Sequence, residues 1–177
     1  IRSSLVLADQ PLVNNYPVIA PDGRSIVYSA AQPRGGLWLR RLDESAWRPL
    51  AGTEGANRPF WSPDSSQIAY FARGKLRSVH IASGVVKDIV AARDFFGGAW
   101  NSADVIIFGL QGNGGLQRVT IGDSVATPLT SVDSSEIAHR WPFFFPDGNR
   151  LLFTRRRTGV PQRGRRHQRR SSRAHRR

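Results

Sequence analysis

Cysteine and methionine are both missing from the 177-residue sequence. Without cysteine, neither a disulfide nor a cysteine-based zinc site can form, and the composition gives no indication of the redox compartment. Without methionine the chain has no initiator residue, so we expect a processed or partial product that begins at Ile1. No stretch approaches the roughly 20 consecutive apolar residues of a membrane-spanning helix, so we predict no membrane span in this chain.

The signatures of catalytic sites are missing as well. The sequence has no G-x-S-x-G elbow for a nucleophilic serine and no G-x-x-x-x-G-K phosphate loop. We expect His80 and His139 to have structural or surface roles, and His167 and His175 have no chemical context. We therefore predict no catalytic residue, no cofactor and no metal ligand, and hence no enzymatic activity in this chain.

Turn formers and strand formers are abundant instead. The chain has 17 glycines and 11 prolines, and Val, Ile, Phe, Trp and Tyr lie in short runs between them. This alternation is typical of an all-β protein.

One motif occurs four times along the chain. Its copies read VIAPDGRSIVYSAA, FWSPDSSQIAYFAR, AWNSADVIIFGLQ and FFFPDGNRLLFTRR, at spacings of 42, 39 and 44 residues. They begin at Val18, Phe60, Ala99 and Phe143. Each of the first three is followed by a glycine, an alternating run, a polar turn and a final short run, whereas the fourth is not. The sequence thus contains three whole units and the first half of a fourth.

Each whole unit has the pattern of four short antiparallel strands. In the second unit we predict these strands at Arg58–Ser62, Gln67–Arg73, Lys75–Ala82 and Val85–Ala92. A sheet of about 40 residues cannot bury both faces alone, and radial stacking of such sheets does bury them. The period therefore predicts an all-β fold, a β-propeller of four-stranded antiparallel blades that is incomplete, with about three and a half blades.

An incomplete set of blades has further consequences. We expect residues 1–154 to be the N-terminal part of a larger ring of six or more blades, with one more strand at Ser3–Ala8. Unclosed blade edges favour self-association.

The repeat also assigns structural roles to particular residues. Proline presets φ at the first turn, aspartate can accept hydrogen bonds from the turn backbone, and glycine permits a positive φ. These turn residues are Pro21, Asp22, Gly23, Pro63, Asp64, Pro146, Asp147 and Gly148. A ring of the three aspartates around a calcium ion is the alternative, but turns between strands do not converge on one point.

Large aromatic residues occupy equivalent places in the first strands. We predict that Trp61, Trp100 and Phe144 fill the wedges between neighbouring blades. Two segments, Arg140–Phe145 and Asp94–Trp100, are dense in aromatic rings. Most of these rings should be inter-blade core, and one or two could line a groove for a peptide.

The motifs FWSPDSSQIAYFA and IAPDGRSIVYSA resemble the repeats of TolB-like, WD-repeat-like bacterial β-propellers, from about Asn15 to Phe153. The segment from Gly36 to Val79 is most similar to the propeller that follows the kinase domain in some bacterial serine/threonine protein kinases. The kinase signatures themselves, the Gly-rich loop and the His-Arg-Asp loop, are absent. The resemblance implies a binding module and favours an extracytoplasmic or periplasmic location.

The last 23 residues differ from the rest of the chain. Residues 155–177 contain eleven arginines and no acid, whereas residues 1–154 carry a net charge of only +2 of the total +13. We expect this Arg-rich tail to be disordered. A shifted reading frame near Arg155 explains its composition, and binding of nucleic acid through the tail alone is the weaker alternative.

These observations favour a non-enzymatic scaffold or binding module for a protein or peptide ligand, as a fragment of a larger protein such as a bacterial serine/threonine protein kinase. The alternatives are a periplasmic TolB-like interaction protein, the propeller of a prolyl-oligopeptidase-like peptidase, and an Arg-tailed nucleic-acid binder. The identity of the ligand does not follow from the sequence.

Overall fold

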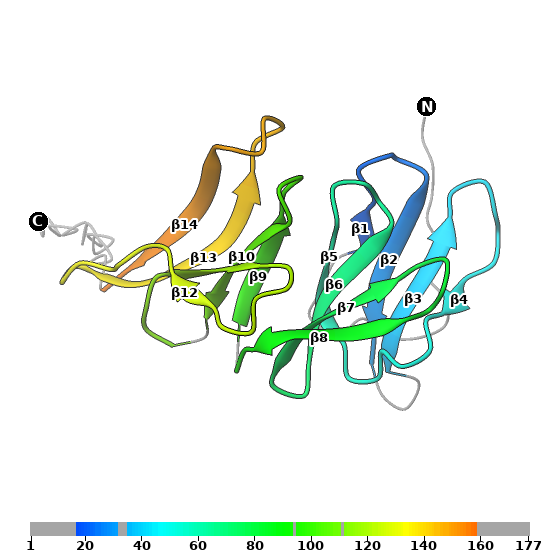
Figure 1. The fold of residues 1–177 in the computed structure, drawn as a ribbon, viewed down its shortest axis with the longest axis horizontal. Coiled ribbons are helices and arrows are strands. Elements are labelled where there is room, and N and C mark those ends of the chain that lie inside the picture. The colour runs from blue at the N-terminus through cyan, green and yellow to red at the C-terminus, as the bar shows by residue number, and fades with distance from the viewer. Residues whose placement is uncertain (1–16, 32–34, 94, 111, 159–177) are drawn as a thin grey trace, which may run out of the picture.

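The computed structural model describes residues 17–31, 35–93, 95–110 and 112–158. Within these ranges the chain forms only strands, arranged as four antiparallel sheets that follow one another in sequence order (Figure 1). The first three sheets have four strands each and the fourth has two. None of the described residues belongs to a helix long and apolar enough to cross a membrane.

In each sheet, strands that follow one another in sequence lie side by side. The first sheet contains β1 (Val18–Ile19), β2 (Ser25–Ala30), β3 (Gly36–Arg41) and β4 (Arg48–Pro49). The second contains β5 (Asn57–Trp61), β6 (Gln67–Ala72), β7 (Lys75–His80) and β8 (Val86–Ala91). The third contains β9 (Phe95–Trp100), β10 (Val105–Leu110), β11 (Leu116–Thr120) and β12 (Thr127–Pro128), and the fourth contains β13 (Glu136–Phe144) and β14 (Leu151–Arg157).

This arrangement confirms the predicted fold class, an incomplete β-propeller of four-stranded blades. All four strands predicted for the second unit are present, and their ends differ from the predicted ones by at most two residues. The first strands of consecutive blades contact one another, β5 with β9 and β9 with β13. Figure 1 shows the blades fanned out from β1–β4, in blue and cyan, to the hairpin of β13, in yellow, and β14, in orange.

The core lies between the blades, where the second strands of the first three blades, β2, β6 and β10, are almost completely buried. Ile68, Tyr70 and Phe71 of β6 have no exposed surface. Ile68 and Tyr70 pack toward the first blade, whereas Phe71 packs toward the third. Because successive residues of a strand point to opposite faces, the near-continuous apolar run QIAYFA serves both interfaces at once.

The last strand extends past the boundary that was drawn from the sequence at residue 154. β14 continues to Arg157, three residues into the segment assigned to the Arg-rich tail. The physical reason is a carboxylate on the partner strand, because the Arg155 guanidinium forms an ion pair with Glu136 of β13. Residues 159–177 and the strand predicted at Ser3–Ala8 lie outside the described residues, so the disorder of the tail and the shifted reading frame stay predictions.

Candidate functional site

The first strands of the second, third and fourth blades share an irregularity in their pairing. In β5 and β13 the pairing shifts register between Asn57 and Phe60 and between Arg140 and Phe143. In β9 two residues separate Phe95 from Gly98 where the partner strand has one. Each of these bulges contains one residue in the left-handed region. These residues are Arg58 (φ 51°), Gly97 (φ 76°) and Trp141 (φ 54°).

Arginine and tryptophan occupy this conformation at a cost. A left-handed φ in a residue other than glycine stores of the order of 1–3 kcal/mol, and such strain clusters at functional sites. Bulges also redirect side chains that would otherwise alternate between the faces of a sheet. At the equivalent place in the third blade, a Cβ on Gly97 would lie 2.7 Å from Cε3 of Trp141. Glycine is therefore required in β9 for the tryptophan of β13 to be accommodated.

The redirected side chains meet in a cluster of cations and aromatic rings. The Arg58 guanidinium lies 4.4 Å from the centre of the Phe96 ring and 5.2 Å from the Trp141 ring. The Arg140 guanidinium lies 3.7 Å from the same Phe96 ring. Phe96 and Trp141 are packed edge to face with centroids 6.0 Å apart. We call Arg58, Phe96, Arg140 and Trp141 the bulge cluster.

The bulge cluster is positively charged and accessible. Trp141 is 49% exposed, whereas the other three members are half-buried. Burial lowers the pKa of Arg58, and the positive charge of Arg140 lowers it further. Burial and the charge of Arg156 lower the pKa of Arg140. Both groups remain protonated, because the ordinary pKa of arginine lies far above neutrality.

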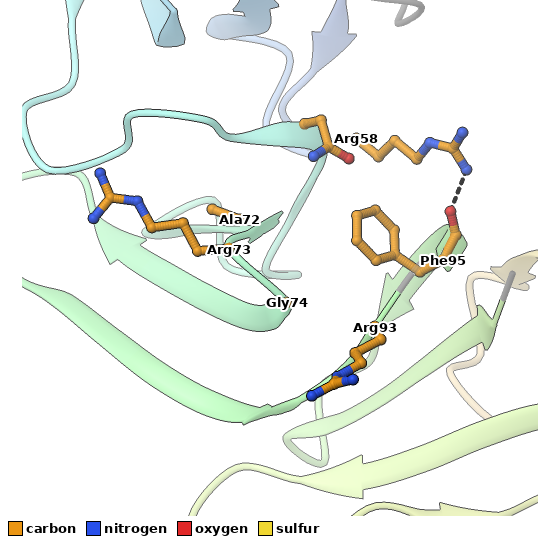
Figure 2. A pocket seen from close by; sticks show the side chains of 7 residues that line it. Arg58, Ala72, Arg73, Gly74, Arg93 and Phe95 are labelled. Atoms are coloured by element: carbon orange, nitrogen blue, oxygen red, sulfur yellow. Dashed lines mark hydrogen bonds between the residues drawn. The ribbon is translucent and has the colours of Figure 1, made fainter.

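A pocket of about 420 Å³ adjoins the cluster at Arg58. Its remaining lining residues come from the start of β5, the β6–β7 turn and the segment that enters β9; they are Asn57, Ala72, Arg73, Gly74, Arg93 and Phe95. Figure 2 shows Arg73 and Arg93 projecting from different segments, while Arg58 extends to the carbonyl of Phe95 and donates a hydrogen bond to it. Three arginine residues thus line one pocket.

The turn residues predicted from the repeat lie in the turns that follow the first strands. Asp22 accepts a hydrogen bond from the amide of Arg24, Asp64 from Ser66, and Asp147 from Asn149 and Arg150. Gly23 (φ 70°) and Gly148 (φ 68°) are left-handed, as is Ser65 (φ 62°) of the second unit. Pro21, Pro63 and Pro146 precede the aspartates in these turns.

Neighbouring turns are also joined to one another. The Asp22 amide donates to Ser65 Oγ at 3.1 Å, and Asn101 Nδ2 donates to the Gly148 carbonyl at 3.0 Å. These hydrogen bonds pack the turns of neighbouring blades against one another. Among the described residues, no three His, Asp or Glu side chains gather in a way that could hold a metal ion.

The aromatic residues predicted for the wedges lie between sheets. Trp61 belongs to the core cluster shared by the first two blades, and its Nε1 donates to the Val18 carbonyl at 3.0 Å. Trp100 belongs to the cluster shared by the second and third blades. Phe144 is partly buried against residues of β10 and β11. Of the two aromatic-rich segments, each contributes one ring, Phe96 and Trp141, to the bulge cluster.

The sequence gives little sign of two members of the cluster. Arg58 has no motif around it, and Arg140 stands out only as part of an aromatic-rich segment. The signal that could have found the site is Pro59 and Pro142, which directly follow Arg58 and Trp141. Proline inside a strand marks a bulge or an edge, and here both prolines stand two residues before the wedge aromatic.

A second cluster of polar side chains, Thr130, Glu136 and His139, lies where the third and fourth blades meet. His139 lies within β13 and is 4% exposed. Its Nδ1 lies 2.7 Å from Thr130 Oγ1 and its Nε2 lies 3.1 Å from Glu136. A hydroxyl, an imidazole and a carboxylate hydrogen-bonded in this order are also the groups of a catalytic triad. Thr130 Oγ1, however, accepts the amide hydrogen of Leu116 at 2.8 Å, so the hydroxyl joins the segment after β12 to β11.

This group predicts acid lability. The hydrogen bond from Arg155 lowers the pKa of Glu136 from its ordinary value of 4.5. A carboxyl group whose pKa is lower in the folded state stabilises the fold above the unfolded pKa and loses that contribution as pH falls through the folded pKa. We expect the urea midpoint of the wild type to fall more steeply than that of Glu136→Gln between pH 5 and pH 3.

The matched control for this prediction is Glu44→Gln, because Glu44 is exposed and pairs only with the exposed Arg41. Its urea midpoint should follow the wild type at every pH. Parallel curves for the wild type and Glu136→Gln over the whole range would contradict the role assigned to the Glu136–Arg155 pair.

Neither a protein-family model nor a curated protein sequence matches this chain. Solved structures do match it. A putative TolB from Agrobacterium tumefaciens superposes with a TM-score of 0.66 and 22% identity, over 77% of this chain and 52% of that chain. TolB from Acinetobacter baumannii gives a TM-score of 0.69 and 19% identity, over 85% of this chain and 39% of that chain.

A third match is the β-propeller domain of Cps50 (Swd1) from Myceliophteria thermophila, with a TM-score of 0.64 and 14% identity, over 88% of this chain and 51% of that chain. At these identities the likeness establishes the fold, a β-propeller similar to those of TolB and WD-repeat proteins. This chain spans about half or less of the length of each of these three structures.

Proposed function

We propose that this chain is a non-enzymatic binding module that presents the bulge cluster to a protein or peptide ligand. The observation that carries the proposal is the pair of strained residues, Arg58 and Trp141, whose left-handed backbone directs a cation and an exposed indole to one site. Strain of this kind persists only where the surrounding structure over-determines it. Tryptophan and arginine are also the residues most enriched at the energetic centres of interfaces.

The parent protein remains open to several proposals. A bacterial serine/threonine protein kinase, in which the propeller would be the sensory or interaction region, is the first of them and rests on the segment Gly36–Val79. A periplasmic TolB-like interaction protein is supported by the two TolB structures. Either parent would place this module outside the cytoplasm. A peptidase-linked propeller is less favoured, because no described residue outside the Thr130–His139–Glu136 group suggests catalysis. An Arg-tailed nucleic-acid binder is less favoured, because residues 1–154 carry a net charge of only +2.

The proposed function predicts that peptide binding requires Trp141. We expect panning of a phage-displayed library of random 12-residue peptides on the full chain to enrich binders that Trp141→Ala retains at least tenfold less well. The reason is that an exposed aromatic at the centre of a site supplies much of the apolar contact area. The measurement is the recovery of each enriched phage on the two proteins.

The control compares the folding of the two proteins. Trp141 is half exposed, so Trp141→Ala should unfold at nearly the wild-type urea concentration. Enriched peptides that bind both proteins equally would place the binding site elsewhere, and a library that yields no binder would contradict the proposed function.

A further inference from the structure

Two guanidinium groups of the bulge cluster share one aromatic ring. Arg58 and Arg140 lie 4.4 and 3.7 Å from the centre of Phe96. They come from different blades, β5 of the second and β13 of the fourth, and Phe96 comes from the blade between them. Three consecutive first strands therefore converge to bring two like charges together.

Neither cation has a carboxylate partner among the described residues. The ion pairs of the described chain involve other basic residues, and none of them includes Arg58 or Arg140. Both side chains are half-buried, and the Nε of Arg140 is completely buried without a hydrogen-bond partner among the described residues. Partly desolvated cations are costly unless an anion compensates them. Their mutual repulsion adds to that cost.

We propose that Arg58 and Arg140 together bind a carboxylate group of a peptide ligand, with Trp141 in contact with an apolar side chain next to it. The proposal rests on the proposed function and adds the chemistry that the site recognises. Guanidinium groups match carboxylate geometry, and hydrogen bonds between charged groups are about twice as strong as neutral ones. An anion between the two arginines would also relieve their repulsion.

A single carboxylate fits the cluster better than a nucleic-acid strand. Strands of nucleic acid are bound in grooves that combine a row of cations with several rings on which successive bases stack. The bulge cluster offers two cations and one exposed ring, Trp141, since Phe96 is already covered by the two guanidinium groups. An acidic side chain beside an apolar one requires no more than this.

The test uses two matched pools of fluorescein-labelled octapeptide amides, X-X-X-Asp-Phe-X-X-X and X-X-X-Asn-Phe-X-X-X, where X is any uncharged residue. Binding to the full chain is measured by fluorescence anisotropy. We expect the Asp pool to bind at least tenfold more tightly than the Asn pool. Arg58→Gln and Arg140→Gln should each reduce the affinity for the Asp pool to about that for the Asn pool.

The matched control variant is Arg150→Gln. Arg150 also stacks on an aromatic ring, 4.9 Å from the centre of Phe145, but lies outside the bulge cluster and pairs with Asp147. It should bind the Asp pool like the wild type. Arg58→Lys provides a second variant with the charge retained, and it should bind the Asp pool with an affinity between those of the wild type and Arg58→Gln.

Several results would overturn the inference. Equal binding of the two pools that is still lost in Trp141→Ala would rule out carboxylate recognition but leave the proposed function standing. No binding by either pool would overturn the inference, and the phage panning described above would then decide the proposed function. The variant Asp94→Asn provides one further test, because Asp94, which lies outside the described residues, precedes Phe95 in the sequence. A preference for the Asp pool in Asp94→Asn but not in the wild type would mean that the chain supplies its own carboxylate. Tight, Arg58-dependent binding of a labelled 12-residue oligouridine, without an Asp preference, would favour nucleic acid instead.

Discussion

Replacement of Trp61 by alanine is expected to lower the free energy of unfolding by about 3–5 kcal/mol, which is the usual cost of removing a buried aromatic side chain. Trp61 is 6% exposed and packs in the core cluster between the first two blades. A domain of this size has only about 5–15 kcal/mol of stability in total. Urea denaturation followed by circular dichroism would measure the loss.

Two other variants separate the contributions of apolar burial and of the indole hydrogen bond to the loss of stability in Trp61→Ala. Trp61→Phe keeps most of the apolar area but leaves the Val18 carbonyl without the indole donor, so we expect an intermediate loss that includes about 1 kcal/mol for the hydrogen bond. Trp141→Ala removes an equally large ring from an exposed position and should change stability little. A loss in Trp61→Ala no larger than that in Trp141→Ala would contradict the proposed wedge role.

Replacement of Gly115 by alanine should destabilise the third blade by about 3 kcal/mol or more. A Cβ at this position would overlap the backbone carbonyl of Thr130. Thr130 cannot move away freely, because its hydroxyl accepts the Leu116 amide hydrogen and contacts His139. Overpacking of a rigid site typically costs 1–3 kcal/mol, and more when the backbone itself must shift. The urea midpoint of Gly115→Ala would report the loss.

Gly84→Ala distinguishes this steric effect from simple backbone strain. Gly84 has a φ of 71°, and a Cβ there would have no neighbour within 4 Å. Alanine at Gly84 should therefore cost only the strain of a left-handed residue, about 1 kcal/mol. If the two variants unfolded at the same urea concentration, the close approach of Gly115 to Thr130 would not be a feature of the folded protein.

The repeat made the architecture predictable because it combines turn and strand motifs with a regular spacing of 39 to 44 residues. Pro-Asp turns and alternating runs defined the four strands of the second unit to within two residues of those observed. The stacking of the blades followed because a four-stranded sheet must bury both faces. Even the left-handed Ser65 could be anticipated, since it aligns with Gly23 and Gly148 of other units.

The bulge cluster could not be predicted in the same way. The left-handed backbone at Arg58 and Trp141 arises from a register shift between strands, which involves pairing partners distant in sequence. Arginine has no preference for that conformation, so the residue type gives no warning. The contact of Arg140 with Phe96 likewise depends on how three blades stack, and only the prolines after Arg58 and Trp141 hinted at an irregular strand.

The extension of β14 to Arg157 has a consequence for how copies of the chain meet. Within the described residues β14 is the outer strand of its sheet, and its last three residues are arginines. Two such strands placed edge to edge would bring rows of like charge together, and charges on an outer strand are a common means by which proteins keep their sheets from growing. We therefore expect the arginines of β14 to oppose edge-to-edge pairing between two copies of this strand.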